Sequence, residues 1–194
     1  MKPGVSAVIP SIPPRKTYLE RALASVRLQS RPVDAVCVAI DVDHDGSAIT
    51  RNKALKAVQT EYCAFLDDDD CWKTWHIRKL MGAAKASKAD VVYPWFDVIS
   101  PNGFDPFPGV FGRPFDPSDL ERRNYIPTTV LARTSALLDV GGFEPYGDQK
   151  ESACDDWGLW RKLLRAGAIF HHLPLKTWDW HWHGKHTSGL GTKW

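Results

Sequence analysis

The sequence has no apolar run of about 18 residues, which excludes a membrane-spanning helix. It also has no block of basic residues, and its 25 basic and 23 acidic residues nearly balance, so nucleic acid is not expected as a main partner. Its four cysteines include no CxxC pair, which argues against a zinc-thiolate site and suits a reduced chain. The N-terminal apolar stretch is short and broken by proline, so we expect no signal peptide and a cytoplasmic location.

What the sequence does contain is an alternation of two patterns. Predicted strands that alternate with helices of about ten to fifteen residues indicate βαβ units and a largely parallel sheet. We therefore expect an α/β fold in a single domain over 1–194, with a nucleotide-binding half over 1–96. The strands are predicted over 5–10, 35–40, 62–66, 90–96, 126–132 and 169–174, and the main helices over 17–30, 47–58, 72–87 and 154–167.

Four adjacent carboxylates, Asp67 to Asp70, follow the predicted strand 62–66. Like charges side by side raise one another's pKa unless positive charge compensates, and no basic residue flanks the run before Lys73. Ligands bind at the carboxyl ends of parallel strands, and oxygen ligands suit Mg²⁺ or Mn²⁺. We predict that Asp67 and Asp69 bind metal and nucleotide, with a solvated acidic turn as the alternative, and that Asp70 caps the next helix.

Two further acidic sites follow the same logic. Asp41 ends the predicted strand 35–40 within "DVDHDGS", although an ordinary Asp-Gly turn explains that stretch equally well. Asp155 and Asp156 open the predicted helix 154–167, where helix capping and chemistry are both open interpretations. Because a helix start favours an ionised carboxylate, we expect Asp156 to be charged at neutral pH.

The order of these motifs resembles glycosyltransferase family 2. The resemblance covers 5–96 and 126–167, and it implies a GT-A fold with a Rossmann-like, mostly parallel central sheet flanked by helices. It implies a metal-dependent hexosyltransferase that moves a sugar from a UDP-sugar, with inversion, to a hydroxyl of a carbohydrate, lipid or protein acceptor, with 97–194 as the acceptor and catalytic half. The stretches that carry it are "VSAVIPS", "YLERALASVRLQS", "TRNKAL", "YCAFLDDDDCW" and "DDWGLWRKLLRAG".

The resemblance also implies roles for individual residues. Asp67 and Asp69 would form the DXD element, one toward the ribose and one on Mn²⁺ or Mg²⁺, and Asp156 would be the general base with Asp155 beside it. The family commonly reads "VDDGS" where this chain has "IDVDHDGS", so either Asp41 or Asp43 would contact the nucleobase. The implied donor-binding set is Pro10, Asp41, Asp43, Arg51, Asp67, Asp68 and Asp69.

The C-terminal tail alternates histidine and tryptophan, a period of two that is typical of a strand. His181 and His183 would then share one face, and either is a candidate third metal ligand; an aromatic strand that packs on the sheet is the alternative. Trp178, Trp180 and Trp182 are candidates for shaping a sugar pocket.

Two other functions remain open at this point. A nucleotidyltransferase also uses an acidic metal site, but it normally has a glycine-rich basic loop after the first strand, and "PSIPPRK" contains no glycine. A non-catalytic module that binds nucleotide-sugars is the second alternative, and a donor hydrolysis assay separates it from an enzyme.

Overall fold

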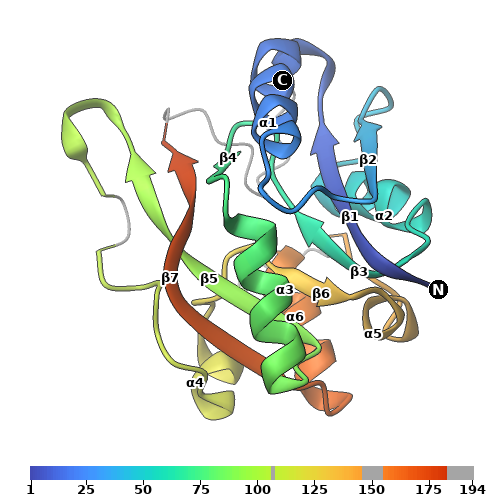
Figure 1. Cartoon of the computed structure of the whole chain (residues 1–194), viewed down its shortest axis with the longest axis vertical. Helices are drawn as coiled ribbons and strands as arrows, with labels where there is room; N and C mark the ends of the chain where they lie inside the picture. Colours follow the sequence, from blue (N-terminus) through green and yellow to red (C-terminus); the bar gives the residue numbers. More distant parts are fainter. Residues whose placement is uncertain (106–107, 146–154, 183–194) are drawn as a thin grey trace.

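A computed structural model describes residues 1–105, 108–145 and 155–182 (Figure 1). In chain order the elements are β1 (Lys2–Ser11), η1 (Pro13–Arg15), α1 (Lys16–Arg27), β2 (Ala35–Ile40), α2 (Ser47–Lys56), β3 (Thr60–Phe65), β4 (Cys71–Trp72), α3 (His76–Ser87), β5 (Val91–Ile99), η2 (Pro101–Gly103), α4 (Pro117–Arg122), β6 (Leu131–Arg133), α5 (Thr134–Asp139), α6 (Asp155–Arg165) and β7 (Phe170–His181), where η marks a short 3₁₀ helix.

The strands form one 7-stranded sheet in the order β2-β1-β3-β6-β5-β7-β4. β1 pairs in parallel with β2 and β3, and β5 pairs in parallel with β7. β6 is antiparallel to both of its neighbours, β3 and β5, and β4 is antiparallel to β7. In the described part of the chain, β1, β2, β3, β5 and β7 therefore share one direction, as the arrowheads of β1, β2, β5 and β7 in Figure 1 illustrate. The predicted α/β fold with a largely parallel sheet is confirmed.

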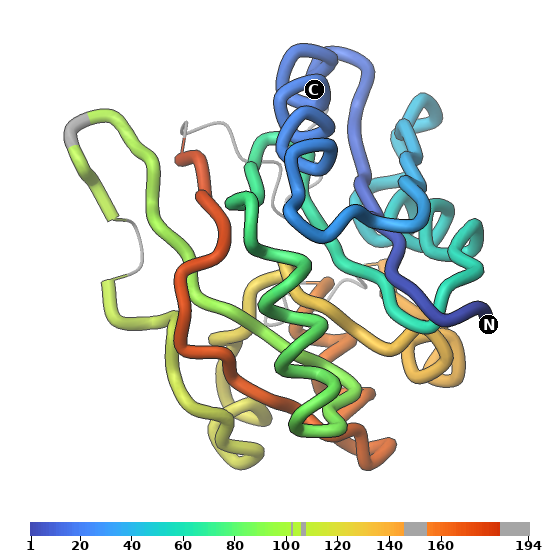
Figure 2. The backbone as a smooth tube through the Cα atoms, viewed as in Figure 1, coloured from blue at the N-terminus to red at the C-terminus, as the bar shows by residue number. Residues whose placement is uncertain are grey.

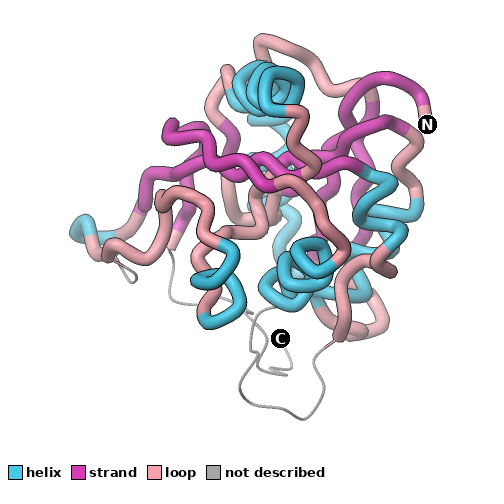
Figure 3. Tube along the Cα trace, turned by 90° about the horizontal axis from the view of Figure 1, so that it is seen from below, coloured by secondary structure: helices cyan, strands magenta, loops and turns pink. Residues whose placement is uncertain are grey.

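Helices cover both faces of the sheet, which Figure 3 shows as a band of strands between two helical layers. On one face Val26 of α1 and Leu80 of α3 lie in one buried cluster with Ile9 of β1, and on the other Leu55 of α2 and Trp160 of α6 lie in a second cluster with Phe65 of β3. Because both faces of the central strands are covered, those strands read as continuous apolar runs rather than alternating ones. Burial of each such large side chain stabilises the fold by roughly 1.5–3 kcal/mol.

Several element boundaries differ from the sequence prediction. The strand predicted over 126–132 is reduced to the three residues of β6, Leu131–Arg133. The predicted helix 72–87 begins only at His76, because Cys71 and Trp72 pair with β7 as the short strand β4. The residue before α3 is Trp75, so the prediction that Asp70 caps this helix is wrong.

The last strand is longer than predicted. The apolar run was expected to end at Pro174, but β7 continues to His181 and pairs with β5 along its length (Figure 2). The pairing register shifts after Pro94, opposite Leu173, and this irregularity accommodates a proline that a regular ladder would exclude. The strand period of the aromatic tail is confirmed up to His181, and His183 lies outside the described residues.

No helix among residues 1–105, 108–145 and 155–182 is both long enough and apolar enough to cross a membrane.

Candidate active site

The carboxyl ends of the parallel strands bring the predicted acidic residues to one edge of the sheet. Ser11 ends β1 next to the buried Pro10, Asp41 directly follows β2, and the run from Asp67 follows β3 after Leu66. β7 ends at the same edge, where the His181 backbone N–H donates to Asp70 Oδ1 at 2.9 Å. The topology therefore brings the donor-side acids together, as the sequence predicted.

The middle of the acidic run is neutralised by an arginine from the segment after β1. Arg15 Nη1 donates to Asp68 Oδ1 at 3.0 Å and to Asp69 Oδ2 at 2.9 Å, and the Ser11 hydroxyl donates to Asp68 Oδ2 at 2.6 Å. Arg21 of α1 adds a hydrogen bond to the backbone oxygen of Asp69. Burial and the charge of Asp69 raise the pKa of Asp68, while Ser11 and Arg15 act against that rise.

Side chains therefore supply the counter-charge that the residues flanking the run lack. Asp68, Asp69 and Asp70 are 3%, 6% and 2% exposed, so the alternative of a solvated acidic turn is wrong for these three. Asp70 is the deepest, and burial together with Asp69 and Asp67 raises its pKa well above the usual range.

Arg51 joins the donor side to Asp155, the neighbour of the predicted base. It projects from α2, with Nη2 at 2.7 Å from Asp67 Oδ1 and Nη1 at 2.6 Å from Asp155 Oδ2. The Ser47 hydroxyl also donates to Asp155 Oδ2, at 2.8 Å. Burial alone would lower the pKa of Arg51, but the charges of Asp155 and Asp67 outweigh burial and raise it, so the guanidinium stays charged.

Asp156 lies in a buried polar pocket at the start of α6. Its Oδ1 accepts from Asn124 Nδ2 at 3.0 Å and from the Trp157 backbone N–H at 2.7 Å, and its Oδ2 accepts from the Thr128 hydroxyl at 3.0 Å. Burial and the charge of Asp155 raise the pKa of Asp156 to about 7, and Arg51 and these hydrogen bonds only partly offset the rise. The prediction that the helix start keeps Asp156 fully charged at neutral pH is wrong, because burial outweighs the helix terminus.

The two nucleobase candidates have different environments. Asp41 is 3% exposed, and its oxygens accept from the backbone N–H groups of Asp45 at 2.8 Å and Gly46 at 2.9 Å. Asp43 is exposed and lies 3.6 Å from Lys53 Nζ across a surface ion pair. Asp41 thus fixes the turn that leads into α2, which fits the predicted alternative of an Asp-Gly turn. The assignment of the base-contacting acid to one of the two stays a prediction.

A family model described as glycosyl transferase family 2 matches residues 42–147, more than half of the chain. The chain belongs to glycosyl transferase family 2. Its relatives include TuaG of Bacillus subtilis, described as a teichuronic acid biosynthesis glycosyltransferase, which is 33% identical over 196 residues that cover 86% of this chain and 74% of TuaG. The pre-mycofactocin glycosyltransferase of Mycobacterium tuberculosis is 28% identical over 141 residues, or 67% of this chain and 29% of that protein.

The fold of this family 2 chain also matches solved structures of S. aureus TarS. The TarS 1–349 structure superposes with a TM-score of 0.72 at 19% identity, covering 93% of this chain and 60% of TarS 1–349. The complex of TarS 1–349 with UDP-GlcNAc gives a TM-score of 0.73 at 18% identity, covering 96% of this chain and 60% of that one. The family 2 chain therefore spans about 60% of the TarS chain that it matches.

The donor-side groups of this family 2 site form no preassembled metal cage. Among the residues that the structure describes, no group of three His, Cys, Asp or Glu side chains gathers at metal-binding distance. The Asp67 side chain is 30% exposed, and the buried His181 Nδ1 has no hydrogen-bond partner among the described residues, 4.0 Å from Asp70 Oδ1. Mg²⁺ is usually held by one or two carboxylates plus substrate phosphates and waters, so these groups fit a cation that arrives with a diphosphate.

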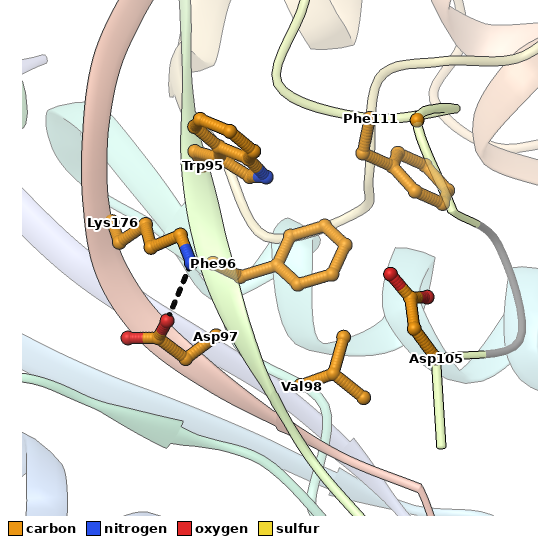
Figure 4. A pocket seen from close by; sticks show the side chains of 8 residues that line it. Trp95, Phe96, Asp97, Val98, Asp105, Phe111 and Lys176 are labelled. Carbon is orange, nitrogen blue, oxygen red and sulfur yellow. Dashed lines mark hydrogen bonds and ion pairs between the residues drawn. The ribbon is translucent and has the colours of Figure 1, made fainter. Parts of the chain in front are cut away.

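A separate open pocket of about 270 Å³ lies between β5, β7 and the segment around Phe111 (Figure 4). Figure 4 shows Phe96 and Phe111 on its wall, and beside them the Lys176–Asp97 ion pair, 2.7 Å between Nζ and Oδ1. Lys176 Nζ also lies 5.1 Å from the centroid of the Trp95 ring. None of the predicted site residues lines this pocket.

Side chains that complete the family 2 site but were not predicted from the sequence include Arg15, Ser11, Asn124 and Thr128. Arg15 and Ser11 hold Asp68, and Asn124 and Thr128 hold Asp156. A usable signal existed for Ser11 and Arg15, because both closely follow the predicted strand 5–10 and so had to lie near its carboxyl end. Asn124 and Thr128 lie in a segment without periodicity, where only the fold reveals their direction.

Proposed function

We propose that this family 2 glycosyltransferase moves a sugar from a UDP-sugar to an acceptor hydroxyl with inversion. The observation that carries the proposal is the Arg51 bridge, which holds Asp67 at the donor edge and Asp155, the neighbour of Asp156, through one guanidinium. The UDP-GlcNAc complex of TarS, which shares this fold, supports a uridine diphosphate donor. Asp41 or Asp43 would accept from the nucleobase, and Asp67 from a ribose hydroxyl.

In the proposed reaction Asp156 accepts the proton of the acceptor hydroxyl. The hydroxyl oxygen forms a bond to the anomeric carbon while the bond from that carbon to the diphosphate oxygen breaks, so that UDP leaves from the opposite face. A pKa of about 7 suits this role, because a general base works best when its pKa is near the working pH. Asn124 and Thr128 orient the carboxylate through its two oxygens.

We also propose that Asp67 and Asp69 hold Mn²⁺ or Mg²⁺ together with the donor, with His181 as a further candidate ligand. A bound cation would supply positive charge to the diphosphate oxygens. Arg15 lies within hydrogen-bond distance of Asp69 and adds fixed positive charge at the same edge.

The test is UDP binding by calorimetry, with Mn²⁺ and with chelator, followed by UDP release from a panel of UDP-sugars. We expect UDP to bind more tightly with Mn²⁺ and at least one UDP-sugar to be hydrolysed. Equal affinity in metal and chelator would remove the metal from the proposal but leave the transferase. Asp69→Asn should abolish the metal effect, and Glu121→Gln, at an ion pair with Arg165 outside the proposed site, is the control.

The rival functions give different outcomes in the same assays. A non-catalytic module would bind UDP-sugars and release no UDP. A nucleotidyltransferase would form a nucleoside diphosphate sugar from a nucleoside triphosphate and a sugar phosphate, releasing pyrophosphate. Inversion is read from the anomeric proton coupling of the first product formed, before mutarotation.

A further inference from the structure

Arg51 is buried between two carboxylates that belong to different parts of the site. Its side chain is 9% exposed, and its two terminal nitrogens contact Asp67 of the β3–β4 loop and Asp155 of α6. The guanidinium also lies 5.6 Å from the ring centroid of Phe143, which closes one side of it. A planar fork can hold two carboxylates in fixed directions, which a single ammonium cannot do.

The two carboxylates face different surroundings. The Asp67 side chain is 30% exposed at the strand ends, whereas that of Asp155 is 8% exposed and adjoins Asp156 in the chain. Asp155 Oδ2 receives hydrogen bonds from both Ser47 and Arg51, which lie about one turn apart on α2. The start of α6 is therefore fixed to α2, and through Arg51 to the accessible carboxylate.

We propose that Arg51 is a positioning residue that couples occupancy of the donor edge to the placement of the base. A ribose hydroxyl or a cation that binds Asp67 competes with Arg51 for that carboxylate. Its binding therefore changes how Arg51 contacts Asp155 and positions the start of α6. This inference rests on the proposed function, in which Asp67 contacts the donor and Asp156 is the base. It differs from the direct donor contact that the family resemblance implies for Arg51.

The first test needs no turnover. Asp67→Asn and Asp155→Asn are made singly and together, and each protein is unfolded in urea. Removing both partners leaves a buried, unpaired charge. The folding equilibrium constant of the double variant should therefore fall at least about fivefold further than the product of the two single-variant decreases. If the decrease in the double variant equals the product of the two single-variant decreases within about twofold, the coupling is overturned. A double variant that fails to fold, although the product of the two single losses would leave the folded state dominant, is itself the non-multiplicative outcome.

The control cycle pairs Asp67→Asn with Asp119→Asn. Asp119 has its own arginine partners, Arg113 and Arg123, and shares none with Asp67. The two losses should therefore multiply.

The second test separates positioning from donor binding. Arg51→Lys keeps the charge but loses the fork, so we expect UDP affinity within about threefold of wild type and turnover of the UDP-sugar at least about tenfold slower. Arg133→Lys is the matched control, because Arg133 also bridges two carboxylates, Glu61 and Asp90, and should keep normal turnover.

Each remaining outcome of the second test has one meaning. Weaker UDP binding with unchanged turnover makes Arg51 a donor ligand and overturns the proposal, as does a variant that changes neither quantity. A wild-type protein that neither binds UDP nor releases it from any UDP-sugar refutes the proposed function. The urea cycle then still decides whether Arg51 couples the two acids.

Discussion

Asn52 and Phe143 are joined by two hydrogen bonds across 91 residues of sequence: Asn52 Nδ2 donates to the Phe143 carbonyl at 2.7 Å, and the Phe143 N–H donates to Asn52 Oδ1 at 2.9 Å. The amide thus pairs with the backbone of Phe143 as a neighbouring strand would. Phe143 packs edge-on against Phe65, with ring centroids 5.2 Å apart, and faces Arg51. Asn52 therefore fixes the wall of the Arg51 site, directly beside Arg51 in the chain.

Asn52→Ala should lower the free energy of unfolding by about 2 kcal/mol, because it removes two hydrogen bonds and leaves a backbone N–H and C=O of Phe143 unpaired. Urea unfolding measures the change. Lys53→Ala is the control, because Lys53 of the same helix is exposed and pairs with Asp45 at the surface, so its loss should barely change the free energy of unfolding. A loss at Asn52 no larger than that at Lys53 would contradict the assigned role.

Two glycines should respond oppositely to the same substitution. Gly142 has φ of +70°, and an added Cβ would lie 2.4 Å from Asn52 Oδ1, so Gly142→Ala should cost more than about 1 kcal/mol. Gly158 lies inside α6 with nothing within 4 Å of an added Cβ, so Gly158→Ala should stabilise by about 0.5–1 kcal/mol. Thermal unfolding of the two variants measures both signs, and equal signs would refute the prediction.

Turnover should rise with pH through the pKa of Asp156, which is raised to about 7, because the base must lose its proton before it can accept another. Asp155→Asn removes a like charge and should shift this rise to lower pH. The pH profile of kcat for UDP-sugar hydrolysis checks both expectations. Asp156→Asn should abolish the rise, with a loss of about 10²–10⁴ in rate at high pH. An unchanged profile in this variant would place the base elsewhere.

The same group should make stability depend on pH. The carboxyl titrates near 3.9 in the unfolded chain and near 7 in the folded one, so the folded state holds the extra proton between these values. The contribution of this group to the free energy of unfolding therefore falls as pH rises from about 4 to about 7, by up to about 1.4 kcal/mol per pH unit. Above about pH 7 the contribution no longer changes with pH. Urea unfolding across this pH range should show the free energy of unfolding of Asp156→Asn rising steadily relative to that of wild type as the pH increases.

Asp41→Ala should weaken UDP binding at least about tenfold, through loss of a charge-assisted hydrogen bond to the base. It should also lower stability, because the N–H groups of Asp45 and Gly46 lose their acceptor. Asp43→Ala, on the exposed side of the same loop, should leave stability unchanged. If Asp43→Ala weakens UDP binding and Asp41→Ala only destabilises, the base-contacting acid is Asp43.

The parts of the fold that could be predicted are those that local sequence determines. β1 and β3 are buried on both faces, so their apolar runs identified them, and the acids after β2 and β3 marked the functional edge. β4 could not be predicted, because its two residues are a strand only through pairing with Trp178 and Asp179 of β7. Its formation moved the start of α3 and gave Asp70 a different role.

The charge balance of the site was equally hidden in the sequence. The cation beside Asp68 is 53 residues away in the chain, and the acid that shares Arg51 with Asp67 is 104 residues from Arg51. No local pattern encodes such partners, because the fold brings them together. Arg15 and Arg51 supply the counter-charge that the residues flanking the run lack, so the support for a metal comes from the chemistry of a diphosphate and not from uncompensated charge.

The place of β6 has a consequence for how the protein is made. This three-residue strand lies between β3 and β5 and bonds to both, yet it follows β5 in the chain by more than thirty residues. A nascent chain that has just completed β5 therefore has its two sheet fragments, β2-β1-β3 and β5, with no strand to join them. Until Leu131, Ala132 and Arg133 leave the ribosome, the inner edges of β3 and β5 are open to other extended chains. Synthesis that stalls in this interval should give an aggregation-prone product, while a chain released after β7 has paired with β5 should not.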